Sequence, residues 1–321
     1  MGASSGVIRI AKRGGCEMSI EMVPFHEGEK LLDWVALTRA FEAGHKLPKA
    51  EIGDTFLYRG KDTLLSRAAW IDGMGIAVKS ATIFPNNPQA NKPVVGGGVN
   101  LYSDADGSLE AIVDFHLVTK WKTAGDSLMG ALKLARKDSR KILIIGAGTV
   151  GRSLRQAYGA GFPDAEFTVW NRTQANAEAM AADYPGMKVA TSLEAAVKEA
   201  DIITSATMVT EPNLMGAWLQ AGQHVDLIGA YRPDMREADD EALTRSRLFV
   251  DSYNTTIGHI GEIEIPLQSG VIQRDDLIAD YYTPEKMQRT SDTEITLFKN
   301  GGGAHLDLMT SRYILEAWRT R

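Results

Sequence analysis

Three glycines with the spacing of a phosphate-binding turn stand near the middle of the sequence. They are Gly146, Gly148 and Gly151 in "KILIIGAGTVGRSL", between an aliphatic run and a helical pattern. Glycines so placed permit a tight turn, a close approach of backbone to pyrophosphate and close helix–strand packing. The first helical residues, Thr149 and Val150, offer N–H groups to an anion. The stretch predicts a dinucleotide-binding turn; the alternative is a glycine-rich turn without a ligand.

The residues about 20 positions further on bear on which dinucleotide is bound. Sites that prefer NAD usually carry Asp or Glu at the end of this second strand, whereas this chain has Asn171, Arg172 and Thr173 in "FTVWNRT". Arg172 would attract a 2′-phosphate, and Asn171 and Thr173 can hydrogen-bond it. NADP(H) is therefore favoured. NAD(H) is possible, because Asn171 can serve a ribose hydroxyl and Arg172 can be a solvated surface residue.

A lysine within an apolar strand pattern is a second candidate for chemistry. Lys79 lies in "GIAVKSATIF", and an ammonium group is costly to bury without a partner or a role. Such a lysine can anchor a substrate carboxylate, or it can supply a proton if its pKa is lowered. The alternative is a half-exposed strand from which Lys79 points outward.

The composition limits the classes of function. The chain has 321 residues, of which 44% are hydrophobic and 24% charged, as in globular proteins with room for two domains. The net charge of −6 argues against a general nucleic-acid surface, and no apolar run reaches the roughly 20 residues of a membrane span. The single cysteine, Cys16, excludes an intrachain disulfide framework, and six scattered histidines give no metal-binding pattern.

The N-terminus shows no targeting signal. It lacks the apolar segment of a signal peptide, and Gly6 stands where a myristoylation motif needs Ser or Thr. We expect residues 1–18 to form a flexible extension and the protein to be cytoplasmic.

The patterning that must position these residues changes near residue 141. Before it, helical spacing over 31–41 precedes alternating runs with a hairpin turn in "DADG", which predicts a helix and a mostly antiparallel sheet. After it, strands alternate with helices, which predicts a parallel sheet covered on both faces. The expected strands are 141–145, 166–170, 201–206, 224–230 and 247–251, and the expected helices include 174–182, 192–199 and 236–244. A last strand in "EITLFKN" precedes three glycines and a C-terminal helix.

Several segments together resemble the ornithine cyclodeaminase/mu-crystallin family. They are "IVDFHLVTKWKTAGDSLMGALKLA", "ILIIGAGTVGRS", "VWNRT", "TEPNLMGAWLQAGQHVDLIGAYRPDMREADDE" and "FKNGGGAHLDL". The resemblance implies an α/β fold in which a Rossmann-type doubly wound parallel sheet, residues 122–303, is inserted into an α+β substrate-binding and dimerisation domain, residues 19–121 plus 304–321. It also implies a homodimer that acts with NAD(H) or NADP(H) on small α-amino or α-imino acids.

The family's substrate-binding positions match this sequence unevenly. Its strand lysine corresponds to Lys79, and the arginine of its "RTA" motif becomes Lys122, followed by Thr123. Lysine keeps the positive charge but loses the bidentate fork for a carboxylate; a plain helix-surface lysine is the alternative. The family's other carboxylate-binding arginine has no clear counterpart. Arg67, in "LLSRAAW", is a better candidate than Arg59, although it can be merely ion-paired.

One position separates the family's reactions. True cyclodeaminases carry an aspartate in a "GADxPGK"-like turn, where this chain has Tyr231 in "GAYRPDMRE". A phenol with a pKa of about 10 is a poor general base at neutral pH. Asp234 and Glu237 look like the first turn of a helix, where acids are favoured. The turn resembles that of mu-crystallin-type ketimine reductases.

The triglycine stretch lies by the nicotinamide in the family. Gly302 and His305 are therefore candidate contacts to cofactor or substrate. His305 is also a candidate proton donor, with a structural histidine as the alternative. The resemblance further implies cofactor contacts at Ala206, Gly229 and Tyr231.

The expected function is NAD(P)H-dependent reduction of a small α-imino acid such as pyrroline-2-carboxylate, piperideine-2-carboxylate or iminosuccinate. Lys79 with Lys122 or Arg67 would hold the carboxylate while the imine carbon takes a hydride. The cations Arg59, Arg67 and Lys122 would suit a diacid. Two alternatives stay open: a cyclodeaminase that releases ammonia from ornithine or lysine with catalytic NAD⁺, and a non-catalytic protein that binds NADP(H) or a small ligand.

Overall fold

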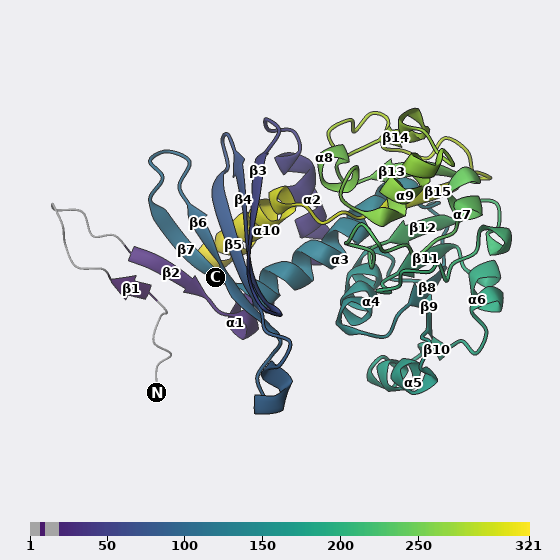
Figure 1. Ribbon diagram of the computed structural model, residues 1–321, viewed down its shortest axis with the longest axis horizontal. Coiled ribbons are helices and arrows are strands. Elements are labelled where there is room, and N and C mark those ends of the chain that lie inside the picture. Colours follow the sequence, from purple (N-terminus) through teal and green to yellow (C-terminus); the bar gives the residue numbers. More distant parts are fainter. Residues whose placement is uncertain (1–6, 10–18) are drawn as a thin grey trace. The chain divides into compact units, whose positions relative to one another are not determined.

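The chain divides into two compact units, which a computed structural model describes for residues 7–9 and 19–321 (Figure 1). Unit 1 comprises the residues up to Lys122 together with Ala304–Arg321, and unit 2 comprises Thr123–Gly303. Residues 7–9 form a strand that the sequence did not predict; the rest of the expected extension over residues 1–18 lies outside the described residues. No helix in the described part of the chain is long and apolar enough to cross a membrane.

Unit 1 contains a seven-stranded sheet in the order β1-β2-β7-β6-β5-β4-β3. All neighbouring strands are antiparallel except β2 and β7. The strands are β1 (Val7–Arg9), β2 (Ser19–Val23), β3 (Glu51–Arg59), β4 (Asp62–Ile71), β5 (Gly75–Ile83), β6 (Val95–Tyr102) and β7 (Leu109–Asp114). The helices are α1 (Phe25–Glu29), α2 (Trp34–Gly44), the 3-10 turn η1 (Asn87–Ala90), α10 (Ala304–Arg319) and the first part of α3 (Phe115–Leu134), which continues into unit 2.

Helix α10 packs against β4, β5 and α2 within unit 1. Alternate residues of a strand share one face, and in β5 these are the buried residues Ala77, Lys79 and Ala81. The two alanines have small side chains, which leaves room around the long lysine between them. The surroundings of Lys79 therefore depend on the helix that covers this face.

Unit 2 contains an eight-stranded, wholly parallel sheet in the order β10-β9-β8-β11-β12-β15-β13-β14. The strands are β8 (Lys141–Ile145), β9 (Glu166–Trp170), β10 (Lys188–Val189), β11 (Ile202–Ser205), β12 (His224–Leu227), β13 (Ser246–Val250), β14 (Leu277–Ala279) and β15 (Ile295–Lys299). The helices are α4 (Thr149–Gly161), α5 (Gln174–Asp183), α6 (Leu193–Glu199), η2 (Gly216–Trp218), α7 (Asp240–Thr244), α8 (Tyr253–Thr256), α9 (Gly261–Ser269) and η3 (Arg274–Asp276). The predicted doubly wound sheet is confirmed, and the strand order reverses at β8, where such folds bind nucleotides.

Both faces of this sheet are covered, as alternate residues of β12 show. Val225 and Leu227 belong to an apolar cluster with residues of α6, α7 and α9. Asp226 points to the other face, where it accepts hydrogen bonds from Ser127 of α3 at 3.0 Å and Tyr158 of α4 at 3.1 Å. A strand buried on both sides explains the nearly continuous apolar runs in this half of the sequence.

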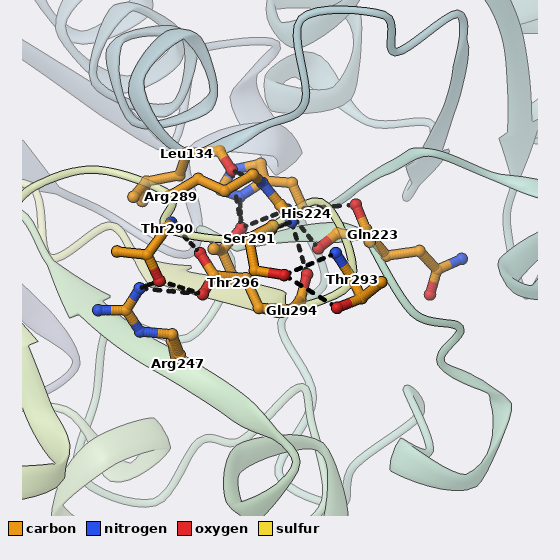
Figure 2. Close-up of polar contacts among 11 residues, drawn as sticks. Leu134, Gln223, His224, Arg247, Arg289, Thr290, Ser291, Thr293, Glu294 and Thr296 are labelled. Atoms are coloured by element: carbon orange, nitrogen blue, oxygen red, sulfur yellow. Dashed lines mark hydrogen bonds and ion pairs between the residues drawn. The ribbon is translucent and has the colours of Figure 1, made fainter.

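Arg289 links the amino-terminal ends of two unit 2 strands, β12 and β15, by hydrogen bonds (Figure 2). Its guanidinium donates to backbone carbonyl oxygens of Leu134, Gly222, Gln223, Ser291 and Glu294 and to Thr296 Oγ1. Five N–H donors in a planar fork suit such a set of acceptors. Because ligands of open α/β sheets bind at the opposite, carboxyl edge, this network supports the scaffold.

Candidate active site

The glycine turn follows β8 at the carboxyl edge of the unit 2 sheet. Gly146 has a φ of 107°, which favours glycine, and a Cβ there would lie 2.9 Å from the carbonyl oxygen of Ala206. A Cβ on Gly151 would lie 2.0 Å from the carbonyl oxygen of Gly146. The packing of the protein itself therefore requires these two glycines.

Gly148 differs, because no described part of the protein requires glycine there. Its φ of −80° and ψ of −169° suit any residue, and a Cβ would meet no described atom within 4 Å. The exposed residues Thr149 and Val150 then begin α4, whose N-terminus has no side-chain cap among the described residues. Open space in front of uncapped helical N–H groups is what a pyrophosphate needs. The residues present thus fit a dinucleotide.

The three residues that bear on the choice of dinucleotide follow β9. Asn171 Oδ1 accepts the N–H of Ala147 at 3.1 Å, and its Nδ2 donates to the Thr173 carbonyl at 2.9 Å. Asn171 therefore braces the glycine turn with its own side chain. Arg172 and Thr173 are exposed, and Arg172 forms no ion pair with a residue that the structure describes, so its guanidinium is available to an anion.

The segments after β11 and β12 pack directly on each other. A Cβ on Gly229 would lie 2.2 Å from the carbonyl oxygen of Thr207. The carbonyl of Ala206 faces Gly146, as described above, so the glycine turn and these two segments line one continuous edge of the sheet. Tyr231 follows and is 59% exposed.

Asp234 and Glu237 do not lie in the first turn of a helix, contrary to the sequence-based expectation. Asp234 is exposed and paired with Arg232 at 2.8 Å. Glu237 is fully buried, and its backbone N–H donates to Glu262 Oε2 at 2.6 Å. This tertiary contact takes up an N–H group that a helix start would otherwise expose, and α7 begins only after it.

A buried aspartate holds the triglycine segment after β15. Gly302 has a φ of 66°, and its N–H donates to Asp251 Oδ2 at 2.9 Å. Asp251 directly follows β13 and also accepts a hydrogen bond from the hydroxyl of Thr256 at 3.1 Å. The triglycine segment is therefore fixed by its backbone.

In unit 1, Lys79 is buried and paired, so the alternative of an outward-pointing lysine is wrong. Its Nζ lies 2.9 Å from Asp307 Oδ1, and their side chains are 9% and 1% exposed. The ammonium group also lies 4.8 Å from the centre of the Phe115 ring. Asp307 stands in the first turn of α10, where a negative charge is favoured.

Lys122 and His305 join the same cluster. Lys122 Nζ lies 3.6 Å from Asp307 Oδ1 and is buried. Burial alone would raise the pKa of Asp307, but the charges of Lys122, Lys79 and Arg67 together hold that pKa below its ordinary value. Burial, then the charges of His45 and Lys122, lower the pKa of His305 well below its ordinary value. At neutral pH the cluster therefore contains an ionised aspartate and a neutral imidazole.

The two arginine candidates differ in their positions. The sheet register pairs Lys79 with Arg67 and Arg67 with Asp54, and Arg67 Nη2 lies 2.7 Å from Asp54 Oδ2. Arg59 ends β3, and its side chain is 81% exposed and paired with Asp62 at 2.9 Å. Arg67 belongs to the row of charges beside Lys79, whereas Arg59 lies at the sheet's hairpin end.

The structure gathers the candidates into two groups, one in each unit. The nucleotide group of unit 2 lines the carboxyl edge of its sheet, and the cation group of unit 1 surrounds Asp307. Thr123 is the first residue of unit 2, and its carbonyl accepts the Asn300 amide at 3.1 Å. Sequence reasoning missed Asp307, although "HLDLMT" begins a helix after glycines; it also missed Asp251, for which no local pattern gave a signal.

Comparisons with known proteins identify the family of the chain and proteins that share its fold. The model of the ornithine cyclodeaminase/mu-crystallin family matches residues 69–321. A Delta(1)-pyrroline-2-carboxylate reductase of Paracoccus denitrificans (strain Pd 1222) is 47% identical over 291 residues, which cover 88% of this chain and 92% of that protein.

Two solved structures share the fold. One is a Thermococcus litoralis Delta(1)-pyrroline-2-carboxylate reductase in complex with NADH and L-proline, at 27% identity and a TM-score of 0.84, with 93% of this chain and 97% of that chain covered. The other is an archaeal alanine dehydrogenase dimer with bound NAD, at 26% identity and a TM-score of 0.84, with 93% and 96% covered. The resemblance drawn from the sequence is confirmed: the chain belongs to the ornithine cyclodeaminase/mu-crystallin family.

Proposed function

We propose that the protein is an NAD(P)H-dependent reductase of a small cyclic α-imino acid, with Delta(1)-pyrroline-2-carboxylate as its substrate. The observation that carries this proposal is the 47% identity to a reductase of that substrate over most of both chains. The buried lysines of unit 1 and the glycine turn of unit 2 supply the chemistry that such a reaction needs.

The charge balance of unit 1 favours a monocarboxylate. Among the buried groups of this cluster, Lys79 and Lys122 face the carboxylate of Asp307, which leaves one net positive charge. A single substrate carboxylate would neutralise it, whereas a diacid would leave an excess negative charge in a buried place. Arg59, which would be needed for a second carboxylate, is exposed and paired with Asp62. Pyrroline-2-carboxylate therefore fits better than iminosuccinate.

The lysines act by positioning. Ammonium groups that donate hydrogen bonds to the substrate carboxylate orient the imine. Because the imine is already held in the reactive geometry, less entropy is lost on reaching the transition state. Asp307 holds Lys79 in place through their ion pair. The neutral imidazole of His305 can donate a hydrogen bond, but it is not the imidazolium form in which histidine delivers a proton. When bound, the reduced nicotinamide supplies the hydride that the imine carbon accepts.

We further propose NADP(H) as the favoured cofactor, because Arg172 is exposed at the end of β9 and no carboxylate stands there.

We also propose a homodimer formed through unit 1. The outer strands β3 and β4 expose large apolar side chains, namely Phe56, Leu57, Tyr58 and Trp70 at 48–72%, and such patches commonly mark interfaces. Sedimentation of the purified protein tests the dimer, and a Leu57→Glu variant should sediment as a monomer.

The function is tested by following NADPH and NADH oxidation with pyrroline-2-carboxylate, piperideine-2-carboxylate and iminosuccinate. We expect turnover with the cyclic imines and the lower KM with NADPH. Release of ammonia from ornithine or lysine without added reductant would instead indicate a cyclodeaminase. Cofactor binding without turnover of any imine or amino acid would indicate a binding protein.

A further inference from the structure

The carboxylate of Glu237 accepts hydrogen bonds from both of the segments that follow β11 and β12. Oε1 accepts the backbone N–H of Thr207 at 2.8 Å, and Oε2 accepts those of Gly229 at 2.5 Å and Ala230 at 3.1 Å. The hydroxyls of Ser205 and Thr207 also donate to Oε1, at 2.6 and 3.0 Å. Five donors thus converge on one fully buried carboxylate, whose two oxygens offer about four lone-pair sites.

Glu237 is itself held from both sides. Its backbone N–H donates to Glu262 Oε2 at 2.6 Å, and its carbonyl accepts the N–H groups of Asn213 at 3.0 Å and Leu214 at 2.9 Å. Burial, followed by the nearby charge of Glu237, raises the pKa of Glu262 to about 7. The chain thus keeps two carboxyl groups close together at an energetic cost, and the carboxylate of Glu237 has little freedom to move.

The amides that Glu237 binds determine where the neighbouring carbonyls point. In a trans peptide the N–H and C=O groups point in opposite directions. Since the N–H groups of Thr207 and Ala230 point at Glu237, the carbonyls of Ala206 and Gly229 point away from it. For Ala206 this is visible in the structure, because its carbonyl oxygen faces Gly146 of the glycine turn.

We infer that Glu237 is a positioning residue for the nicotinamide cofactor: it fixes the peptide planes after β11 and β12, at the carboxyl edge where the cofactor binds. The inference rests on the proposed function. Glutamine cannot replace Glu237, because its amide NH₂ would face either the Thr207 donor or the Gly229 and Ala230 donors. One segment would then turn away from its present orientation.

The test compares Glu237→Gln with Asp226→Asn. Asp226 is also a fully buried carboxylate with several hydrogen bonds, but its partners are side chains within the fold and not the amides of the cofactor edge. Dissociation constants for NADPH and NADH are measured by fluorescence titration without substrate, and melting temperatures are measured in parallel. We expect Glu237→Gln to raise the dissociation constant of the preferred cofactor at least tenfold. Asp226→Asn should change this dissociation constant less than twofold.

The outcomes separate the two proposals. A merely structural Glu237 would lower the melting temperature and leave the cofactor affinity of the folded variant within twofold of wild type, which would overturn the inference. If Glu237→Gln does not fold, Glu237→Asp retains the charge with a shorter reach, and wild-type affinity in that variant would overturn it as well. Failure of the wild-type protein to bind either cofactor would instead refute the proposed function.

Discussion

Replacing Lys79 by methionine tests the proposed substrate-binding role of the unit 1 cluster separately from its structural role. Lys79 and Lys122 lie 2.9 and 3.6 Å from Asp307, attractions of about 6 and about 5 kcal/mol at an effective dielectric constant of about 20. After Lys79→Met, Asp307 still has Lys122 and the charges balance. After Asp307→Asn, two buried ammonium groups repel each other without a counter-ion. Breaking a buried pair costs about 3–5 kcal/mol, and we expect Asp307→Asn to reach this range and Lys79→Met to stay below it.

The loss of activity should follow the opposite order and be larger in Lys79→Met than in Asp307→Asn. Lys79→Met removes a charged hydrogen bond to the substrate carboxylate, worth about 1.5–3 kcal/mol, so kcat/KM should fall about 10- to 150-fold. Asp307→Asn leaves both ammonium groups in place, so the folded variant should lose less. The KM for the cofactor should stay within about twofold in both variants, because neither residue belongs to the nucleotide group.

The assay is steady-state oxidation of NADPH with pyrroline-2-carboxylate, combined with urea unfolding of the same samples. Lys61→Met is the matched control, since Lys61 lies in the turn between β3 and β4 of the same sheet and is exposed. Its rate and stability should equal those of the wild type. If Lys79→Met reduces the imine at the wild-type rate, Lys79 does not bind the substrate and the assignment of this cluster is refuted.

Three further predictions concern unit 2. Gly148→Ala should change the free energy of unfolding by less than about 0.5 kcal/mol, because its Cβ meets no described atom within 4 Å, yet titration should show cofactor binding weakened; equal binding would mean that no phosphate sits there. Arg172→Ser should raise the KM for NADPH about tenfold and leave that for NADH unchanged; equal changes would remove Arg172 from phosphate recognition. Burial, the largest cause, raises the pKa of Asp226 to about 6 in the folded protein, so its stabilising effect is complete below about pH 4 and is lost as pH rises to about 6. Compared with Asp226→Asn in urea unfolding, the wild type should lose about 3 kcal/mol more between these pH values, and parallel curves would contradict this.

Local patterns were sufficient for much of unit 2. The turn requires a positive φ at Gly146 and a close approach of backbone at Gly146 and Gly151. Only glycine meets these requirements, so the glycine spacing in the sequence predicts the turn. The parallel sheet followed from the alternation of short apolar runs with helical spacing, because strands covered on both faces must be apolar throughout. The expected helix over 236–244 failed in its first part, since Glu262 binds the backbone of Glu237 from a distant helix.

What the sequence determined by itself was the family, the fold class and the identity of Lys79 as a residue out of place in an apolar strand. Only the tertiary structure decided what surrounds it. Asp307 lies 228 residues further along the chain, and the packing of α10 on β5 brings the two charges together. The sequence context favoured Arg67 over Arg59, and only the strand register showed that Arg67 lies beside Lys79 and Arg59 at an exposed hairpin. Sequence patterns predict which residues are buried and where the backbone turns. The pairing of buried charges depends instead on which elements pack face to face.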